Sequence, residues 1–241
     1  MMKILLIGDY PPPYGGISVH VQQLARFLTQ NGAVCRVIDI EPGSAPKEGA
    51  IRVKGGVDFL RRLAAFSAKG YEAHIHTNGH NFKSWAAIGA TAWVGFVFNR
   101  RNIATLHSGH TPAYLSAAGA WRRRLIRLFL RPLGKVIAVS EKIEKALLEL
   151  KVDSRRISVL PAFSLGDRSE AIPERARIWR EKFKPLIVSA VYLEEEYGVS
   201  FLIEACGALQ KIYPDLGCII MGSGSQEGSL RREIQKRGGE G

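Results

Sequence analysis

The sequence has little cysteine and no long apolar run. Its three cysteines are Cys35, Cys206 and Cys218. They lie among apolar residues without C-x-x-C spacing, which excludes a disulfide framework and a thiolate zinc site and is typical of a reduced, cytoplasmic protein. The longest mostly apolar stretch is residues 85–98. Because a membrane-spanning helix needs about 20 such residues, this shorter stretch predicts a buried helix of a soluble domain.

Two motifs that an N-terminal segment often carries are also absent. The apolar run after Lys3 is broken by Asp9 and three prolines before it reaches the length of a secretory signal, about 7–15 residues. The dinucleotide fingerprint G-x-G-x-x-G is missing, because Gly8 is followed by no glycine before Gly15. These absences argue against a secreted protein and against a simple NAD-binding domain.

A ligand-binding pattern is present in KILLIGDYPPPYGGISVHVQQLARFL, residues 3–28. Residues 4–7 form a short apolar run typical of a buried parallel strand, and from Ile17 onwards apolar positions recur at helical spacing. Gly15 and Gly16 stand at the predicted helix start, with Ser18 in its first turn. A glycine pair there lets a ligand approach the backbone, and the unpaired N–H groups favour an anion such as a phosphate. The alternative is a tight turn without a ligand.

Strands and helices alternate along the rest of the chain. Strands are predicted at residues 34–40, 51–53, 73–76, 102–107, 135–139, 157–160, 186–192 and 217–221. Helices are predicted around residues 59–66, 121–131, 141–150 and 199–213, and after the GSGS turn. This order predicts an α/β fold with parallel, covered sheets. It comprises one complete doubly wound, Rossmann-like domain (1–165), a linker (166–184) and the first two βα units of a second domain (185–241).

Histidines gather after the predicted strand at 73–76, in the polar segment HTNGHNFKSW. Such a segment at the carboxyl end of a parallel strand is typical of a ligand-facing loop. His74, His76 and His80 lie within seven residues of one another, which resembles a metal cluster. No carboxylate accompanies them and the spacing matches no standard zinc pattern, so no metal site is predicted.

Positive charge is concentrated in the first part of the chain. Residues 1–165 contain 23 basic and 10 acidic residues, whereas residues 166–241 contain 11 and 12. The densest cluster, AWRRRLIRLFLRPLGK, contains Arg122, Arg123, Arg124, Arg127 and Arg131. Trp121, Leu125, Leu128 and Phe129 are predicted to line the opposite side of a basic amphipathic helix. Two interpretations stay open: the arginines face an anionic membrane, or they are solvated on an ordinary domain helix.

Six segments occur in an order that resembles a known family: GGISVHVQQLARFLTQNG, IHTNGH, TLH, VIAVSEKI, ISVLPAF and YGVSFLIEACGALQKIYPDLGCIIMGSG. Together they resemble family 4 of the retaining glycosyltransferases, over nearly the whole chain. The resemblance implies a two-domain GT-B fold, in which an acceptor domain and a nucleotide-sugar-binding domain flank a cleft. It also implies a nucleotide-diphosphate-sugar donor as substrate and a glycan or lipid-linked acceptor, as in polysaccharide biosynthesis. The cysteine usage and the basic helix predict a cytoplasmic enzyme, either free or peripheral on the inner face of the membrane. Neither a cofactor nor a metal is implied.

The resemblance also implies roles for individual residues. His107, which closes the T-x-H strand, would lie beside the transferred sugar as the catalytic residue. Donor or acceptor binding is expected from Gly15, Gly16, His76, Asn78, Tyr192, Tyr197, Gly222 and Gly224. Nucleic acid is not an expected partner, because aromatic residues are not interleaved with the basic cluster as a base-stacking surface requires.

The chain departs from the family pattern in two places. Tyr192 and Tyr197 stand where the family has the arginine and lysine that clamp the diphosphate, and Glu194, Glu195 and Glu196 lie between them. The paired glutamates that contact the donor sugar and ribose in the family would fall beyond Gly241. The resulting expectation is a hexosyltransferase-type enzyme that is truncated and inactive as this chain. The alternative is a non-catalytic, acceptor-binding remnant.

Overall fold

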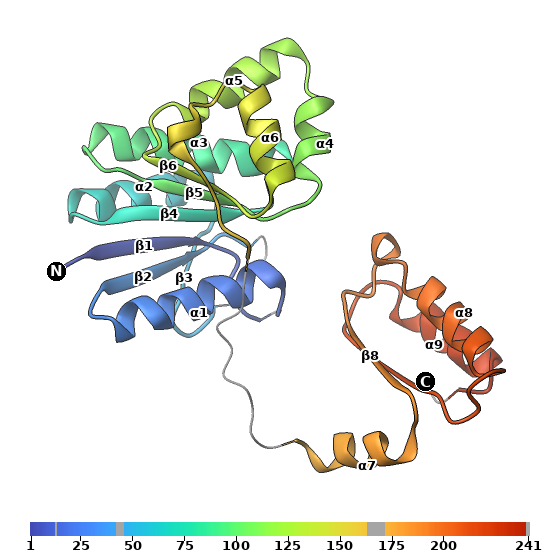
Figure 1. Ribbon diagram of the computed structural model, residues 1–241. Coiled ribbons are helices and arrows are strands. Elements are labelled where there is room, and N and C mark those ends of the chain that lie inside the picture. Colours follow the sequence, from blue (N-terminus) through green and yellow to red (C-terminus); the bar gives the residue numbers. More distant parts are fainter. Residues whose placement is uncertain (13, 42–45, 163–171, 240–241) are drawn as a thin grey trace. The chain divides into compact units, whose positions relative to one another are not determined.

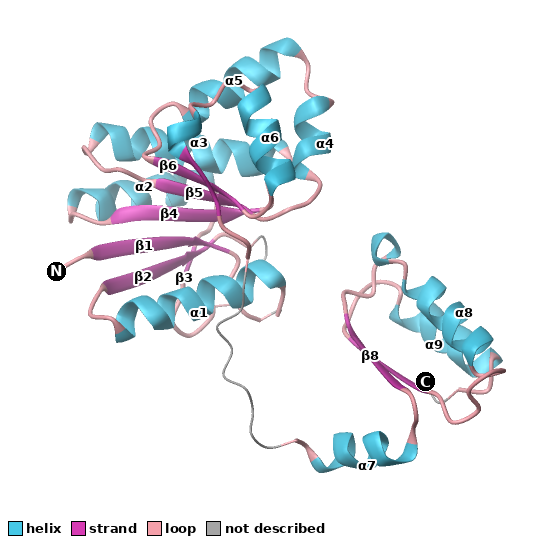
Figure 2. Ribbon diagram, viewed as in Figure 1, coloured by secondary structure: helices cyan, strands magenta, loops and turns pink. Residues whose placement is uncertain are grey.

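The computed structural model describes residues 1–12, 14–41, 46–162 and 172–239 (Figures 1 and 2). The chain divides into two compact units, Met1–Gly166 and Asp167–Gly241. Each unit has its own sheet and its own apolar core, and the two are described separately below. Among the described residues, no helix is both long and apolar enough to cross a membrane.

Unit 1 is built on a sheet of seven parallel strands. In chain order they are β1 (Lys3–Gly8), β2 (Val34–Asp39), β3 (Ile51–Arg52), β4 (Glu72–Thr77), β5 (Ile103–Leu106), β6 (Lys135–Ala138) and β7 (Ile157–Val159). In space the order is β3-β2-β1-β4-β5-β6-β7. The chain therefore moves outward from β1 in one direction, returns, and continues from β4 in the other. In open α/β sheets the ligand crevice lies at such a reversal, beyond the carboxyl ends of the strands.

Helices cover this sheet unequally. They are α1 (Gly16–Gln30), α2 (Gly56–Ala68), α3 (Phe82–Val97), α4 (Thr111–Ser116), α5 (Ala120–Leu130) and α6 (Glu141–Glu149). Side chains alternate across β1: Leu6 packs with Val21 of α1, whereas Leu5 and Ile7 belong to the larger core built with α2 to α6. Figure 1 shows α1 on one side of the strands and α3, α5 and α6 on the other. The histidines of β4 lie on the face of the sheet that α1 covers.

The predicted strands and helices of unit 1 are confirmed, with one addition and one correction. The addition is the short helix α4, which has a proline in its first turn and was not predicted. The apolar stretch at 85–98 forms most of α3 but is not buried throughout, since Trp93, Phe96 and Val97 near its carboxyl end are exposed. Apolar composition alone could not distinguish the covered turns of this helix from the uncovered one.

Unit 2 is a small α/β unit. It contains α7 (Glu174–Lys182), β8 (Leu186–Ala190), α8 (Val199–Leu209), β9 (Gly217–Met221) and α9 (Glu227–Lys236). β8 and β9 pair in parallel, and a small core joins Leu193, Val199, Ile203 and Leu230. The segment 166–184, predicted to be a linker, contains α7; its residues 166–171 lie outside the described residues. This helix has no buried residue, so it lacks the apolar periodicity that would have revealed it.

Candidate functional site

The candidate site lies at the strand-order reversal, where β1, β4 and β5 end. Gly8, the last residue of β1, makes the site compact: a Cβ at this position would lie 3.0 Å from Cγ2 of Val21 and 3.3 Å from Cβ of His76. A glycine therefore allows α1 to pack closely against the ends of β1 and β4. The backbone N–H of His107 donates to the carbonyl of Thr77 over 2.9 Å, which places the ends of β4 and β5 side by side.

Three histidines from three different elements meet here. His20 comes from α1, His76 from β4 and His107 from the position after β5. Nδ1 of His76 lies 3.1 Å from Nε2 of His107, a hydrogen bond between the two rings. The ring centroid of His20 is 5.3 Å from that of His76 and 5.1 Å from that of His107. We call these three residues the histidine triangle.

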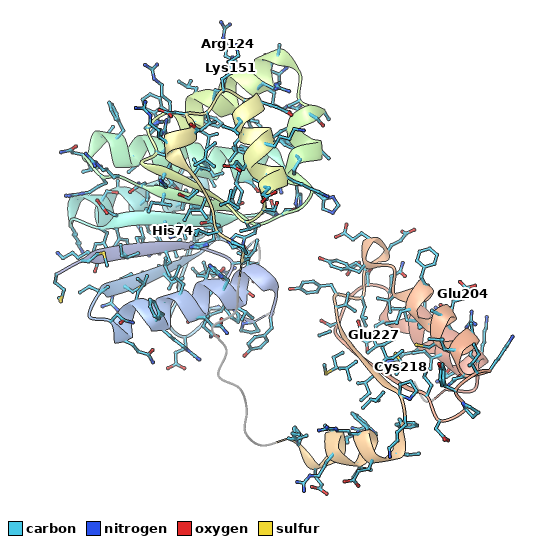
Figure 3. All side chains as sticks on the ribbon, in the orientation of Figure 1. His74, Arg124, Lys151, Glu204, Cys218 and Glu227 are labelled. Carbon is cyan, nitrogen blue, oxygen red and sulfur yellow. The ribbon has the colours of Figure 1, made fainter. Side chains whose placement is uncertain are left out.

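A fourth histidine supports the triangle from within the sheet. The ring of His74 lies 4.1 Å from that of His76, centroid to centroid, and its Nε2 is 2.7 Å from the hydroxyl of Thr105 on β5. Figure 3 labels His74 within unit 1, among the sheet strands. His74 thus has its own hydrogen-bond partner and serves as a packing surface for His76.

Burial keeps these rings uncharged. Burial, with a smaller contribution from His107 and His20, lowers the pKa of His74 to about 3. Burial likewise lowers the pKa of His76 well below its usual value, and that of His107 to about 4. At neutral pH the site therefore presents neutral imidazoles, which donate one hydrogen bond and accept another.

The loop after β4 is organised by Asn78. Its side-chain oxygen accepts a hydrogen bond of 2.7 Å from the hydroxyl of Ser84, and its backbone carbonyl accepts one of 2.7 Å from the hydroxyl of Thr111. Gly79 follows with φ of +68°, and a Cβ there would lie 2.9 Å from Leu106. The predicted binding residue Asn78 thus fixes the loop shape through its described contacts.

Gly15 and Gly16 begin α1 as predicted. The backbone N–H of Gly15 donates to the hydroxyl of Ser18 over 2.8 Å, so a side chain of the first turn already satisfies this N–H. A Cβ at Gly16 would meet nothing within 4 Å. Open space in front of Gly16 is compatible with the predicted approach of a ligand to the helix start.

An ion cluster at the ends of β1 and β2 was not found by sequence reasoning. Lys47 Nζ lies 2.9 Å from Oδ2 of Asp39 and 2.5 Å from Oε2 of Glu41, and it also donates to the carbonyl of Tyr10. The side chains of Lys47 and Asp39 are both almost fully buried. Burial raises the pKa of the neighbouring Asp9, and the negative charges of Glu41 and Asp39 raise it further. The available signal was Asp39 itself, an acid that ends an apolar strand.

In unit 2, the glycines of the GSGS turn allow close backbone packing. A Cβ at Gly222 would lie 1.8 Å from the carbonyl oxygen of Val191, and one at Gly224 would lie 2.4 Å from that of Leu193. Neither position tolerates a side chain, irrespective of any ligand.

The acidic segment before α8 folds onto the same turn. The carboxylate of Glu194 accepts hydrogen bonds from the backbone N–H and the hydroxyl of Ser225, 2.8 and 2.5 Å long. These bonds lower the pKa of Glu194. The rings of Tyr192 and Tyr197 lie 6.0 Å apart, centroid to centroid, so the two predicted binding tyrosines are neighbours.

The basic cluster of α5 forms a groove of about 1030 Å³ on the surface of unit 1. Its lining includes Trp121, Arg124, Leu125, Arg127, Leu128, Arg131 and Lys151. The predicted separation of apolar and basic sides is wrong: Ile126 and Leu130 face the core, whereas Trp121 and Leu128, 65% and 45% exposed, lie beside the arginines. Apolar residues occur at more positions of this helix than the core can cover.

The five arginines of α5 and its end have different surroundings. Arg123 donates to the backbone carbonyls of Leu115 and Glu149, and Arg122 is half-buried with its guanidinium 5.5 Å from the Trp121 ring centroid. Arg124, Arg127 and Arg131 are exposed in the groove, and no ion pair involves them among the described residues. Figure 3 shows Arg124 and Lys151 projecting from the same side of unit 1.

The fold is of the doubly wound α/β class, with polar side chains gathered at the strand-order reversal of its parallel sheet, and comparison with known families agrees with this class. Residues 14–163 match Glycosyltransferase Family 4, and the chain belongs to this family. No protein of curated function matches the sequence.

Solved structures show the same GT-B fold at low sequence identity. Anabaena Alr3699/HepE, solved with UDP-glucose, is 18% identical with a TM-score of 0.67, over 99% of this chain and 66% of that one. The lipopolysaccharide outer core galactosyltransferase WaaB is 12% identical with a TM-score of 0.53, over 98% and 65%. The UDP-GlcNAc 2-epimerase from Methanocaldococcus jannaschii is 12% identical with a TM-score of 0.57, over 98% and 69%. The chain thus spans about two thirds of the length of these proteins.

Proposed function

We propose that the protein is a retaining glycosyltransferase that transfers a hexose from a nucleotide-diphosphate-sugar to a hydroxyl of a glycan or lipid-linked acceptor. Membership of Glycosyltransferase Family 4 supports the class of reaction. The structural neighbour HepE, solved with UDP and with UDP-glucose, supports a nucleotide-sugar as donor. The observation that carries the proposal is the pair of neutral imidazoles, His76 and His107, at the strand-order reversal of the sheet.

The chemistry requires no charged base from the protein. The bond between the anomeric carbon and the donor phosphate breaks, the acceptor oxygen bonds to the same carbon, and its proton passes to the leaving phosphate. An uncharged His107 can hydrogen-bond a sugar hydroxyl without attracting the diphosphate away from its own site. The first turn of α1, with open space in front of Gly16, would face the donor phosphate or the acceptor. No metal or cofactor is part of this mechanism.

The test is the variant His107→Ala in the full product of the gene. Turnover is expected to fall by at least tenfold. Because the ring also bonds His76, the melting temperature will fall as well, so specific activity is compared in the folded fraction. The conservative variant His107→Asn, which keeps a hydrogen-bonding side chain, should recover part of the turnover. Near-normal specific activity of folded His107→Ala protein would remove His107 from the site.

The residues 1–241 by themselves are expected to show little sugar transfer. The described part of unit 2 has only two strands, Tyr192 and Tyr197 replace the family's cations, and Glu194 already occupies the donors of Ser225. These features favour the second candidate function, binding of an acceptor without catalysis. Assay of residues 1–241 against a panel of nucleotide sugars, with isothermal titration of UDP, separates the two. Robust turnover would contradict the second candidate.

Membrane association belongs to the same proposal. A lipid-linked acceptor is reached at a membrane surface, and the groove along α5 combines exposed arginines with exposed Trp121 and Leu128. Basic side chains attract anionic headgroups, and a tryptophan is suited to the boundary between headgroups and acyl chains. We therefore propose the groove as the surface through which the protein binds the inner face of an anionic membrane.

A further inference from the structure

We propose that the histidine triangle (His20, His76 and His107) binds one divalent transition-metal ion, Zn²⁺ being the representative case. One ring nitrogen from each residue lies within 4.8 Å of the other two. The proposal concerns a property beyond sugar transfer, which needs no metal, and it holds whether or not the protein is a transferase.

The spacing of the rings matches that of three imidazoles around one ion. The three centroid distances are 5.3, 5.1 and 5.4 Å, so the rings form a nearly equilateral triangle. With Zn–N bonds of about 2.0–2.1 Å and tetrahedral angles, three imidazole centroids lie about 5.2 Å apart and their nitrogens about 3.4 Å apart. Nδ1 of His76 and Nε2 of His107 are already 3.1 Å apart. A small rotation of the His20 side chain brings the third nitrogen into place.

The state of the rings also suits a metal. Imidazole ligates as the neutral base, the form that burial favours here. The shared N–H between His76 and His107 moves to the outer nitrogen of one ring when both inner nitrogens face the ion. Nε2 of His76, the outer nitrogen of that ring, has no hydrogen-bond partner among the described residues, so the proton can move there without breaking another hydrogen bond. His20 and His107 are only half-buried, so an ion can enter from solvent.

The ligand set predicts which ions bind. Three nitrogen ligands without carboxylate favour Zn²⁺, Co²⁺, Ni²⁺ or Cu²⁺, whereas Mg²⁺ and Ca²⁺ need oxygen ligands. Three protein ligands leave a fourth position open to water or to another small ligand. Because the ion would take the ring nitrogen that His107 offers to a sugar, Zn²⁺ is expected to inhibit any transfer at this site.

The sequence could not reveal this triple. The histidines that are close in sequence are His74, His76 and His80, but His74 bonds Thr105 and His80 bonds Ser108. His20 and His107 reach His76 only through the packing of α1 and the pairing of β5 with β4. A metal site assembled from three elements has no spacing signature.

The experiment titrates tag-free, chelator-treated protein with Zn²⁺ in competition with a chromophoric chelator, and with Co²⁺ while recording the visible spectrum. The wild type should bind one equivalent of Zn²⁺, give the intense bands of tetrahedral Co²⁺, and ignore millimolar Mg²⁺. His20→Asn and His107→Asn should each weaken Zn²⁺ binding at least tenfold. His110→Asn, a change at an exposed histidine outside the triangle, is the matched control and should bind as the wild type does.

Three results would overturn the proposal. They are the absence of saturable Zn²⁺ binding, unchanged affinity in both His20→Asn and His107→Asn, and equal weakening by His110→Asn, which would indicate surface histidines. Circular dichroism of each variant confirms that it is folded, and His20→Asn, on the surface of α1, is the variant least able to disturb the core. Because no sugar is present, the outcome is independent of the transfer reaction.

Discussion

His76 is a titratable side chain that has almost no contact with water. A buried imidazole accepts a proton less readily than an exposed one, because burial penalises the charged form. The same holds for His74 and His107, and the three rings adjoin one another. The folded state therefore disfavours protonation at three neighbouring residues of unit 1.

The stability of the protein should accordingly depend on pH between about 7 and 4. In the unfolded chain these histidines take up protons below about pH 6.5, whereas in the folded chain His107 does so only near 4 and His74 near 3. The unfolded state binds more protons in this window, so the free energy of unfolding is highest above pH 6.5 and falls as the pH decreases. Urea unfolding at pH 7.5, 6.0 and 5.0 with a chelator present measures this. Equal stability at pH 7.5 and 5.0 would contradict it, and His107→Asn should flatten the slope.

Sequence reasoning at this scale identified residues that end strands. His107 and Asn78 were expected at the site from the family resemblance, and each follows a predicted parallel strand; the structure places both at the carboxyl edge of the sheet. His20 and Lys47 were missed for a physical reason. His20 lies inside a helix whose apolar periodicity explains the segment by itself, and the partners of Lys47 are set by loop geometry after β2.

The buried side-chain amide of Asn102 forms hydrogen bonds that connect three elements of unit 1. Its Oδ1 accepts from the backbone N–H of Ala73 at 2.8 Å, and its Nδ2 donates to the carbonyl of Thr91 at 2.7 Å. It thereby connects the start of β5 to β4 and to α3. Gly95 is needed for this arrangement, since a Cβ there would lie 2.3 Å from Nδ2 of Asn102.

Replacement of Asn102 by alanine should destabilise unit 1 by about 2–4 kcal/mol, because two buried backbone groups lose their partners. Asn102→Asp should cost at least as much, since aspartate cannot donate to Thr91 and introduces a buried charge. Guanidinium unfolding followed by circular dichroism measures both. The control is Asn31→Ala at the exposed end of α1, whose side-chain amide donates to the carbonyl of Phe27. A loss for Asn102→Ala no larger than that for Asn31→Ala would refute the bridging role.

Elements with strong periodicity were predicted from the sequence, and those held by local or polar contacts were not. The strands β1 and β6 are short apolar runs, and β4 alternates apolar with polar residues, so the existence of these strands follows from the sequence pattern. α4 is only six residues long, and α7 buries no side chain. Ser140 stands at the N-cap position of α6, but its side chain makes no capping hydrogen bond.

At the scale of the molecule, the sequence predicts an excess of positive charge, and the structure shows where part of this charge is exposed. The groove along α5 holds Arg124, Arg127, Arg131 and Lys151, and its single acid, Asp153, is paired with Arg155. Each basic residue near an anionic bilayer contributes about 1 kcal/mol of attraction, so this group is expected to be sufficient for the reversible membrane binding that we propose.

Liposome co-sedimentation tests this directly. The wild type should pellet with vesicles containing anionic lipid at low salt, and much less with neutral vesicles or at high salt. The triple variant Arg124→Gln, Arg127→Gln, Arg131→Gln should lose most of this binding. The variant Arg36→Gln, Arg61→Gln, Arg232→Gln removes the same charge from exposed positions elsewhere and should bind nearly as the wild type does. Equal losses in the two variants would show that only net charge matters.

The two-stranded sheet of unit 2 leaves Val188 and Met221 about half exposed, at 56% and 50%. The enthalpy and the heat capacity change of unfolding both grow with the amount of buried surface that becomes hydrated. Because unit 2 buries little surface, its unfolding should absorb little heat, spread over a wide temperature range. Calorimetry of residues 1–241 is expected to show a broad, low-enthalpy transition before the sharp transition of unit 1. A single transition with equal calorimetric and van't Hoff enthalpies would contradict this. A small core thus makes unit 2 the part of the chain that melts at the lowest temperature, and any ligand that binds the folded form of this unit would raise that temperature.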